Sequence, residues 1–120
     1  MAEPDRDERK RLMQVALNEA ALRQVNERIY GPGRSGSGLP EFPIVCECGA
    51  LSCEATLTVD ATLYSSVRAD PHRFLVMTGH EIPEAEVVVV RHGDIAVVEK
   101  HPGEARLVTE ATDPRSDRSN

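Results

Sequence analysis

Residues 46–53 read Cys-Glu-Cys-Gly-Ala-Leu-Ser-Cys, which places all three cysteines of the chain in one short segment. Cys46, Cys48 and Cys53 form a CxC-x4-C pattern at a predicted turn between two strands. Thiolates crowded at a turn are typical zinc ligands, and a structural zinc ion takes four nitrogen or sulfur ligands in a tetrahedron. The pattern therefore predicts a zinc ion bound by these cysteines and by one residue from elsewhere in the chain.

A histidine is the expected fourth ligand, and the chain offers His72, His80, His92 and His101. His80 is preferred, because it follows a predicted strand and because Gly79 permits a sharp bend that presents the imidazole ring. His92 falls in a distant hairpin turn, and His72 lies beside a proline at a helix end. His101 follows the last predicted strand and is the second choice.

Two other interpretations of the cysteines stay open. Single buried cysteines commonly act as small hydrophobic residues, but Glu47, Gly49 and Ser52 between the thiols argue against a purely apolar cluster. A redox switch, in which oxidation of the thiols releases the metal, fits the same pattern. The odd number of cysteines argues against a disulfide framework.

The segment around the cysteines combines short strands with one short helix. Residues 59–69 predict the helix, with Thr58 or Asp60 as its cap. Residues 92–94 predict a hairpin turn between the last two strands. The valine run 87–90 shows no alternation, so both faces of that strand are expected to be covered. The predicted strands are 42–45, 55–57, 74–77, 87–90 and 95–98.

Residues 1–30 predict one amphipathic helix. The helix is expected either to pack on its own domain or to pair with a helix of another chain, in which Asn18 would fix the register. The Gly/Ser/Pro stretch 31–41 predicts a flexible linker. The apolar stripe of the helix, which recurs at three- and four-residue intervals beside Asn18, consists of Leu12, Val15, Leu22, Val25 and Ile29.

The linker separates this helix from a compact part, residues 42–102. Residues 103–120 begin with a predicted helical turn at 104–111 and end in a polar tail that is expected to be disordered. At about sixty residues, the compact part has a size at which a core alone is marginal and a metal is a common stabiliser. The N-terminal helix is the alternative means of completing the core. The predicted fold class is α+β, with a small, mainly antiparallel sheet, one short helix and a zinc knuckle.

Composition and charge exclude several classes of function. The chain of 120 residues has a formal charge of -6, and residues 31–102 hold five basic against ten acidic side chains. Nucleic-acid binding requires clustered Lys and Arg, and aromatic residues, at 3%, are too few to stack on exposed bases. The longest apolar run is too short to span a membrane, and the charged N-terminus lacks the apolar region of a signal peptide. We expect a cytoplasmic protein that binds neither nucleic acid nor membranes.

A set of short motifs extends from the predicted N-terminal helix to the last strand. In chain order they are Asn18-Glu19-Ala20, Val25-Asn26-Glu27-Arg28, Val45-Cys46-Glu47-Cys48 with Cys53, Leu57-Thr58, Val67-Arg68-Ala69-Asp70-Pro71-His72-Arg73-Phe74, Gly79-His80 and Val97-Val98-Glu99-Lys100. Together they resemble a family of small bacterial proteins that has no established activity, over roughly residues 15–112. The resemblance implies that the three cysteines and His80 belong together. This chain departs from the family pattern in its longer Gly/Ser linker.

The sequence favours a non-catalytic binding or regulatory module that acts through protein contacts, and not an enzyme. Three thiolates make zinc a poor Lewis acid, and catalysis by zinc requires an open coordination position. The expected partner is another protein or a second copy of the chain, bound through the N-terminal helix. The alternatives are a thiol-based redox sensor and a zinc-dependent enzyme.

Overall fold

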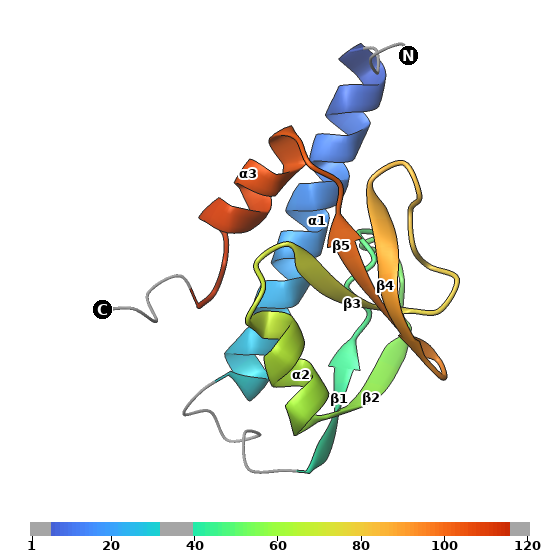
Figure 1. Ribbon diagram of the computed structural model, residues 1–120, viewed down its shortest axis with the longest axis vertical. Coiled ribbons are helices and arrows are strands. Elements are labelled where there is room, and N and C mark those ends of the chain that lie inside the picture. Colours follow the sequence, from blue (N-terminus) through green and yellow to red (C-terminus); the bar gives the residue numbers. More distant parts are fainter. Residues whose placement is uncertain (1–5, 32–39, 116–120) are drawn as a thin grey trace.

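The computed structural model describes residues 6–31 and 40–115 of the chain. Within these residues, a long N-terminal helix and two small antiparallel sheets with short helices form the α+β fold expected from the sequence (Figure 1). The elements in chain order are α1 (Arg6–Tyr30), β1 (Glu41–Val45), β2 (Thr56–Asp60), α2 (Ala61–Arg68), β3 (Arg73–Met77), β4 (Glu86–His92), β5 (Ile95–Lys100) and α3 (Glu104–Ala111).

The strands β1 and β2 form a hairpin that brackets the cysteines. Their antiparallel register pairs Ile44 with Leu57, and both side chains are buried. β2 leads directly into α2, because the Asp60 carboxylate accepts a hydrogen bond from the Leu63 amide at 2.7 Å and caps the helix. Of the two predicted caps, Asp60 is the one used, and Thr58 lies within β2.

The second sheet has the strand order β3-β5-β4, and β5 is buried on both faces. Successive strand residues point to opposite faces, so the sheet supports two cores. The face that includes Val97 packs against the β1–β2 hairpin and against Tyr64 of α2. The face that includes Val98 packs against Cys46 and Cys48. The cysteines therefore belong to the second core of the fold.

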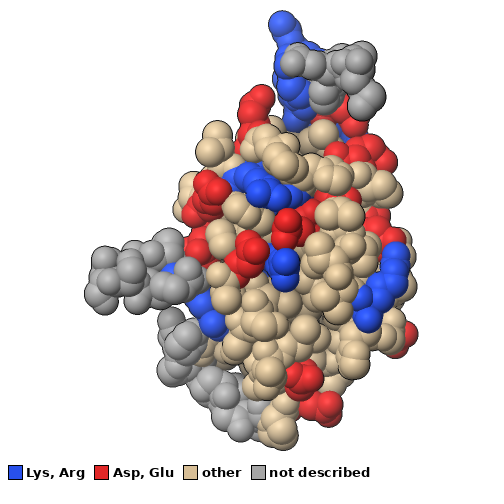
Figure 2. Space-filling model, viewed as in Figure 1, with Lys and Arg blue, Asp and Glu red and all other residues tan. Residues whose placement is uncertain are grey.

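The strand β4 lies at the edge of this sheet, and its valines are not covered as the sequence predicts. Val87, Val89 and Val90 remain 49, 39 and 45% exposed. A β-bulge between Val88 and Val90 shifts the register against β5, and Val88 is the valine that packs against the second core. Figure 2 shows a largely uncharged area in the lower half of this view, where β4 and α2 face the viewer. The prediction of two covered faces is wrong, because the run reflects β-propensity and not burial.

Helix α1 packs on its own chain through a face of mixed character, and the apolar stripe predicted from the sequence supplies only part of it. Val15 of that stripe is buried, whereas polar residues dominate the second half of the face. Arg23 and Asn26 are 1% exposed, and the Arg23 guanidinium lies 4.7 Å from the centre of the Phe74 ring. Val25 and Ile29, which belong to the predicted stripe, remain 45 and 47% exposed. The helix thus helps to complete the second core with buried polar groups that are hydrogen-bonded to other elements. Apolar periodicity alone does not predict such contacts.

The helix α3 confirms the predicted turn at 104–111 and returns the chain to α1. The Arg23 guanidinium donates to Thr109 O at 2.9 Å and to Thr112 Oγ1 at 3.1 Å, which joins the two helices. Residues 1–5, 32–39 and 116–120 lie outside the described part of the chain. The predicted start of the first helix, most of the predicted linker and the last part of the predicted disordered tail fall there. Residues 112–115 of that tail are described, and Arg115 donates to the Glu27 carboxylate of α1 at 2.6 Å.

Candidate metal centre

The three cysteines and His80 converge at one place beside the second core. Each offers one ligand atom, and these atoms all lie within 4.8 Å of one another. His80 Nδ1 lies 3.6 Å from the Sγ atom of Cys46 and 3.6 Å from that of Cys53. All three cysteines are free thiols. The residues chosen from the sequence are therefore close enough to bind a metal ion.

Two of the distances between donor atoms agree with a tetrahedral site. Zn–S bonds of about 2.3 Å and Zn–N bonds of about 2.0–2.1 Å place sulfur and nitrogen ligands about 3.5 Å apart in a tetrahedron. The two distances of 3.6 Å from His80 Nδ1 agree with this value. Thiolate and imidazole donors suit zinc, whereas magnesium and calcium require oxygen ligands. The chemistry of the four residues thus fits the zinc ion predicted from the sequence.

The cysteine loop, residues 46–53, is held from two sides. The Cys46 amide donates to Ala55 O at 3.1 Å and extends the β1–β2 hairpin by one pair. Gly49 adopts a φ of 84° and faces α1, where an added Cβ would lie 3.1 Å from Val15 Cγ1. Only glycine combines this positive φ with so close an approach to α1 without strain. Asn18 Nδ2 donates to Gly49 O at 2.9 Å, so the polar residue of the predicted stripe contacts this loop.

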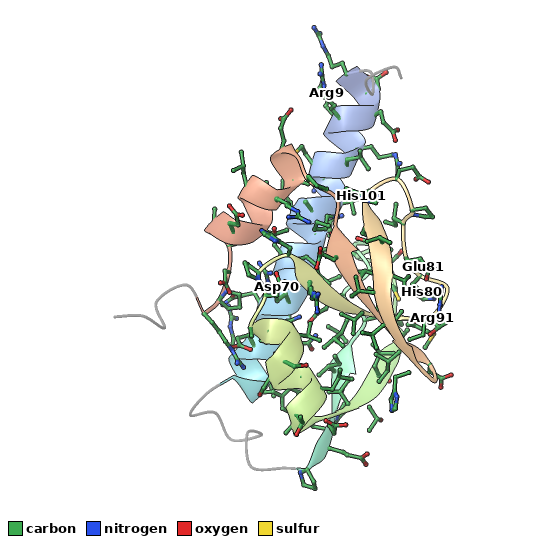
Figure 3. All side chains as sticks on the ribbon, in the orientation of Figure 1. Arg9, Asp70, His80, Glu81, Arg91 and His101 are labelled. Atoms are coloured by element: carbon green, nitrogen blue, oxygen red, sulfur yellow. The ribbon has the colours of Figure 1, made fainter. Side chains whose placement is uncertain are left out.

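His80 is presented by the turn that follows β3. Its amide donates to Met77 O at 2.9 Å, and Gly79 has a φ of 97°, which is the sharp bend predicted from the sequence. The Glu81 carboxylate accepts the Gly79 amide at 2.9 Å and pairs with Arg91 of β4 at 3.1 Å. Figure 3 shows His80, Glu81 and Arg91 close together on one side of the molecule. These contacts hold the turn in the position that directs the imidazole toward the cysteines.

The two buried thiols hold their protons more tightly than free cysteine does. Burial raises the pKa of Cys46, although the Met77 amide donates a hydrogen bond of 3.2 Å to its sulfur. Burial also raises the pKa of Cys48, and the Ala50 amide opposes this effect. A metal ion must displace these protons, because the thiolate is the ligand. Metal binding at this site is therefore expected to strengthen as the pH rises.

The other histidines lie elsewhere with other partners. His101, the second choice for the fourth ligand, has Nε2 at 2.8 Å from Pro83 O. His72 Nε2 lies 2.7 Å from a carboxylate oxygen of Glu110. His92 is exposed at the end of β4, next to the hairpin turn. The structure thus brings His80, among the four histidines, to the cysteines.

Glu47 is a polar spacer in the sequence but a fully buried residue in the structure. Its carboxylate pairs with Arg68 at 2.8 Å and accepts a hydrogen bond from Asn26 Nδ2 at 2.8 Å. Its presence between Cys46 and Cys48 therefore does not argue against a buried cluster, and these cysteines are 2 and 4% exposed. The sequence did contain a signal for this arrangement, because Glu47 alternates with Cys46 and Cys48. In extended chain, successive side chains point to opposite sides.

The chain matches no protein-family model, no curated protein and no solved structure. The resemblance to a family of small bacterial proteins accordingly stays a prediction. Among the described residues, no helix combines the length and the apolar character that crossing a membrane requires.

Proposed function

We propose that the protein is a zinc-binding module in which Cys46, Cys48, Cys53 and His80 hold one structural Zn²⁺ ion. The observation that carries this proposal is the convergence of four ligand atoms within 4.8 Å of one another. These atoms come from residues up to 34 positions apart in the chain. Three soft thiolates and one imidazole favour zinc over the hard cations that oxygen ligands select.

The proposed role of the ion is to join parts of the fold that the chain connects only through loops. Cys46 follows β1, Cys53 precedes β2, and His80 lies between β3 and β4. A zinc ion on these ligands would fasten the two-stranded hairpin to the three-stranded sheet. Structural zinc in small domains contributes on the order of 10 kcal/mol at neutral pH, which is comparable to the whole stability of a typical domain.

A non-catalytic role suits this set of ligands. Four protein ligands complete a tetrahedron and leave no position for water or substrate, whereas catalytic zinc keeps one position open. Three thiolates also reduce the positive charge with which zinc polarises a substrate. We therefore favour a binding or regulatory module over an enzyme.

The outer face of α1 is the surface proposed for contact with another protein chain. Leu17, Val25 and Ile29 remain 47, 45 and 47% exposed, and Ala21 lies between them at four-residue spacing on the same face. Exposed apolar patches on soluble domains commonly mark protein contacts. We propose a second copy of the chain as the occupant. Sedimentation velocity over a range of concentrations should then show a dimer that Val25→Ser weakens and Leu107→Ser on α3 does not, whereas a monomer at every concentration would contradict this.

Substitution of Co²⁺ tests whether the site is closed. A tetrahedral cobalt site with thiolate ligands absorbs visible light intensely, whereas five- and six-coordinate sites absorb weakly. We expect an intense tetrahedral spectrum that does not change when azide is added, because no position is open to it. A weak spectrum, or a spectrum that azide alters, would contradict the non-catalytic proposal and favour a zinc-dependent enzyme.

A further inference from the structure

Glu47 separates two proposed metal ligands in the sequence, yet its carboxylate lies in the core among three other elements. One oxygen, Oε1, accepts hydrogen bonds from Arg68 of α2 at 2.8 Å and from the Leu75 amide of β3 at 3.0 Å. The other, Oε2, accepts from Arg68 at 2.9 Å and from Asn26 of α1 at 2.8 Å. The Glu47 and Arg68 side chains are 0 and 1% exposed. Each carboxylate oxygen therefore accepts two hydrogen bonds in a site closed to solvent.

The same segment of chain is docked along the outer edge of β3. The Glu47 amide donates to Leu75 O at 2.9 Å, while the Leu75 amide donates to the Glu47 carboxylate. Two residues further along β3, the Met77 amide donates to Cys46 Sγ at 3.2 Å. These bonds fix Cys46 against the strand that leads into the His80 turn. The separation between the Cys46 sulfur and His80 thus depends on how this segment sits on β3.

Asn26 of α1 holds the residues on both sides of Cys46. Its Nδ2 atom donates to Val45 O at 3.0 Å and to Glu47 Oε2 at 2.8 Å. Its Oδ1 atom accepts the Val45 amide at 2.9 Å. The backbone that carries this ligand is therefore held by α1 as well as by β3. Helix α2 acts on this backbone through the Glu47 carboxylate, and α1 acts on it both through the same carboxylate and directly at Val45.

We propose that Glu47 is a positioning residue of the metal centre, which sets zinc affinity by holding Cys46 and Cys48 in the orientation that meets His80. The proposal rests on the zinc site proposed above. Residues that orient metal ligands from outside the coordination shell typically change metal affinity by about 10–100-fold when they are replaced. Because Asn26 and Arg68 hold the same carboxylate, zinc binding and the docking of α1 and α2 strengthen each other. Such coupling is reciprocal by thermodynamic necessity.

The test replaces Glu47 by Gln, which keeps the size of the side chain but turns one acceptor into a donor that faces Arg68 or Asn26. The matched control is Glu27→Gln, because Glu27 of α1 is also buried and accepts hydrogen bonds from Tyr64 and Arg115, which lie outside the cysteine loop. Zinc dissociation constants are measured by competition with a chromogenic chelator. Thermal midpoints and the visible spectrum of the Co²⁺ form are recorded for each variant.

We expect Glu47→Gln to raise the zinc dissociation constant by about 10–100-fold and to shift the Co²⁺ spectrum. Glu27→Gln should lower the thermal midpoint but leave both metal readouts unchanged. Asn26→Ala keeps the Glu47–Arg68 pair and should raise the dissociation constant by a smaller factor. If Glu47→Gln does not fold, the zinc dissociation constant of Asn26→Ala tests the positioning role in its place.

The possible failures separate the two proposals. Variants of Glu47 and Asn26 that melt earlier but bind zinc with the affinity and Co²⁺ spectrum of the native chain would overturn the positioning role and leave the zinc site standing. A native chain that binds no zinc would overturn the zinc site, and the positioning role with it.

Discussion

Two buried ion clusters lie inside the molecule, and they differ in charge balance. In the first, Glu47 and Arg68 carry one charge of each sign, and both carboxylate oxygens accept two hydrogen bonds. In the second, Lys100 Nζ lies 2.7 Å from Glu19 and 3.3 Å from Glu86, so two carboxylates share one ammonium group. All five side chains are almost completely buried. Both clusters therefore pair acidic with basic side chains, but the first is electrically balanced and the second has one carboxylate in excess.

The second cluster balances its charge most simply if the Glu19 carboxyl keeps its proton. Glu19 Oε2 has no hydrogen-bond partner within the described part of the chain, whereas Glu86 Oε2 accepts the Ile82 amide at 3.1 Å. Burial and the neighbouring Glu86 carboxyl raise the pKa of Glu19 well above its ordinary range, although Lys100 opposes them. A buried charge with a full set of partners thus holds the surrounding elements in place, whereas an excess buried carboxylate makes the free energy of unfolding depend on pH.

The largest effect is expected when the metal is lost, because the two clusters should then differ in hydrogen exchange. Only the first cluster contains a residue, Glu47, that lies between two proposed ligands in the chain. His80→Ala removes the fourth ligand and should release zinc. Hydrogen exchange should then accelerate at the Leu75 amide, which donates to Glu47. The Lys100 amide, which donates to His72 O at 2.9 Å, should keep its protection.

The control for this experiment is His92→Ala, which changes an exposed histidine far along the chain from the cysteines. It should leave the zinc content and both amides as they are in the native protein. Zinc retained by His80→Ala but lost from a His101→Ala variant would show that the fourth ligand is assigned incorrectly. Equal acceleration of the two amides in His80→Ala would remove the distinction between the clusters.

A smaller but still large effect is expected when the balanced cluster is broken. Arg68→Met leaves the Glu47 carboxylate buried without its cation, which should lower the free energy of unfolding by about 3–5 kcal/mol. Arg11→Met is the matched control, because Arg11 pairs with Glu84 on the surface at 2.9 Å with 45% of its side chain exposed. Chemical denaturation with zinc present measures both.

The exposed pair should contribute little, as surface salt bridges usually do. The double variant Arg68→Met with Glu47→Leu should recover part of the loss, because no unpaired charge remains in the core. Equal losses for Arg68→Met and Arg11→Met would contradict the importance given to the buried pair.

The last predicted effect concerns the unbalanced cluster and depends on pH. The unfolded chain ionises Glu19 near its ordinary pKa, while the folded protein keeps the proton, so stability falls as the pH rises above that value. Glu19→Gln has no proton to lose, and its stability relative to the native chain should increase by up to about 1.4 kcal/mol for each pH unit. Thermal and chemical denaturation between pH 5 and pH 8 would measure this gap, and a constant or shrinking gap would contradict the protonated state of Glu19.

Local patterns in the sequence predicted much of the fold. The Asp60 cap, the hairpin turn before Ile95 and the bend at Gly79 depend on neighbouring residues, and the structure has all three. The ligand set followed from the spacing of the cysteines and from the place of His80 after a strand. The cap, the turn, the bend and the cysteine spacing each involve residues close together in the chain, so a single sequence is enough to predict them.

The features that the sequence did not predict depend on contacts between distant segments. Apolar periodicity placed Val25 and Ile29 on the packing face of α1, but the second half of that face is polar because Arg23 and Asn26 find partners on other elements. Glu47 looked like a spacer because its partners lie 21 and 28 positions away. Hydrogen-bond partners of buried polar groups cannot be read from hydrophobic patterns, since such patterns record only apolar burial.

We propose above that one zinc ion is bound in a closed site by Cys46, Cys48, Cys53 and His80. The most direct test is elemental analysis of protein prepared without added metal, combined with X-ray absorption at the zinc edge. We expect one zinc per chain, with three sulfur ligands at about 2.3 Å and one nitrogen ligand at about 2.0–2.1 Å. A protein that contains no metal and still unfolds cooperatively with its native stability would contradict the claim, as would a zinc ion with a bound water in place of one of these residues.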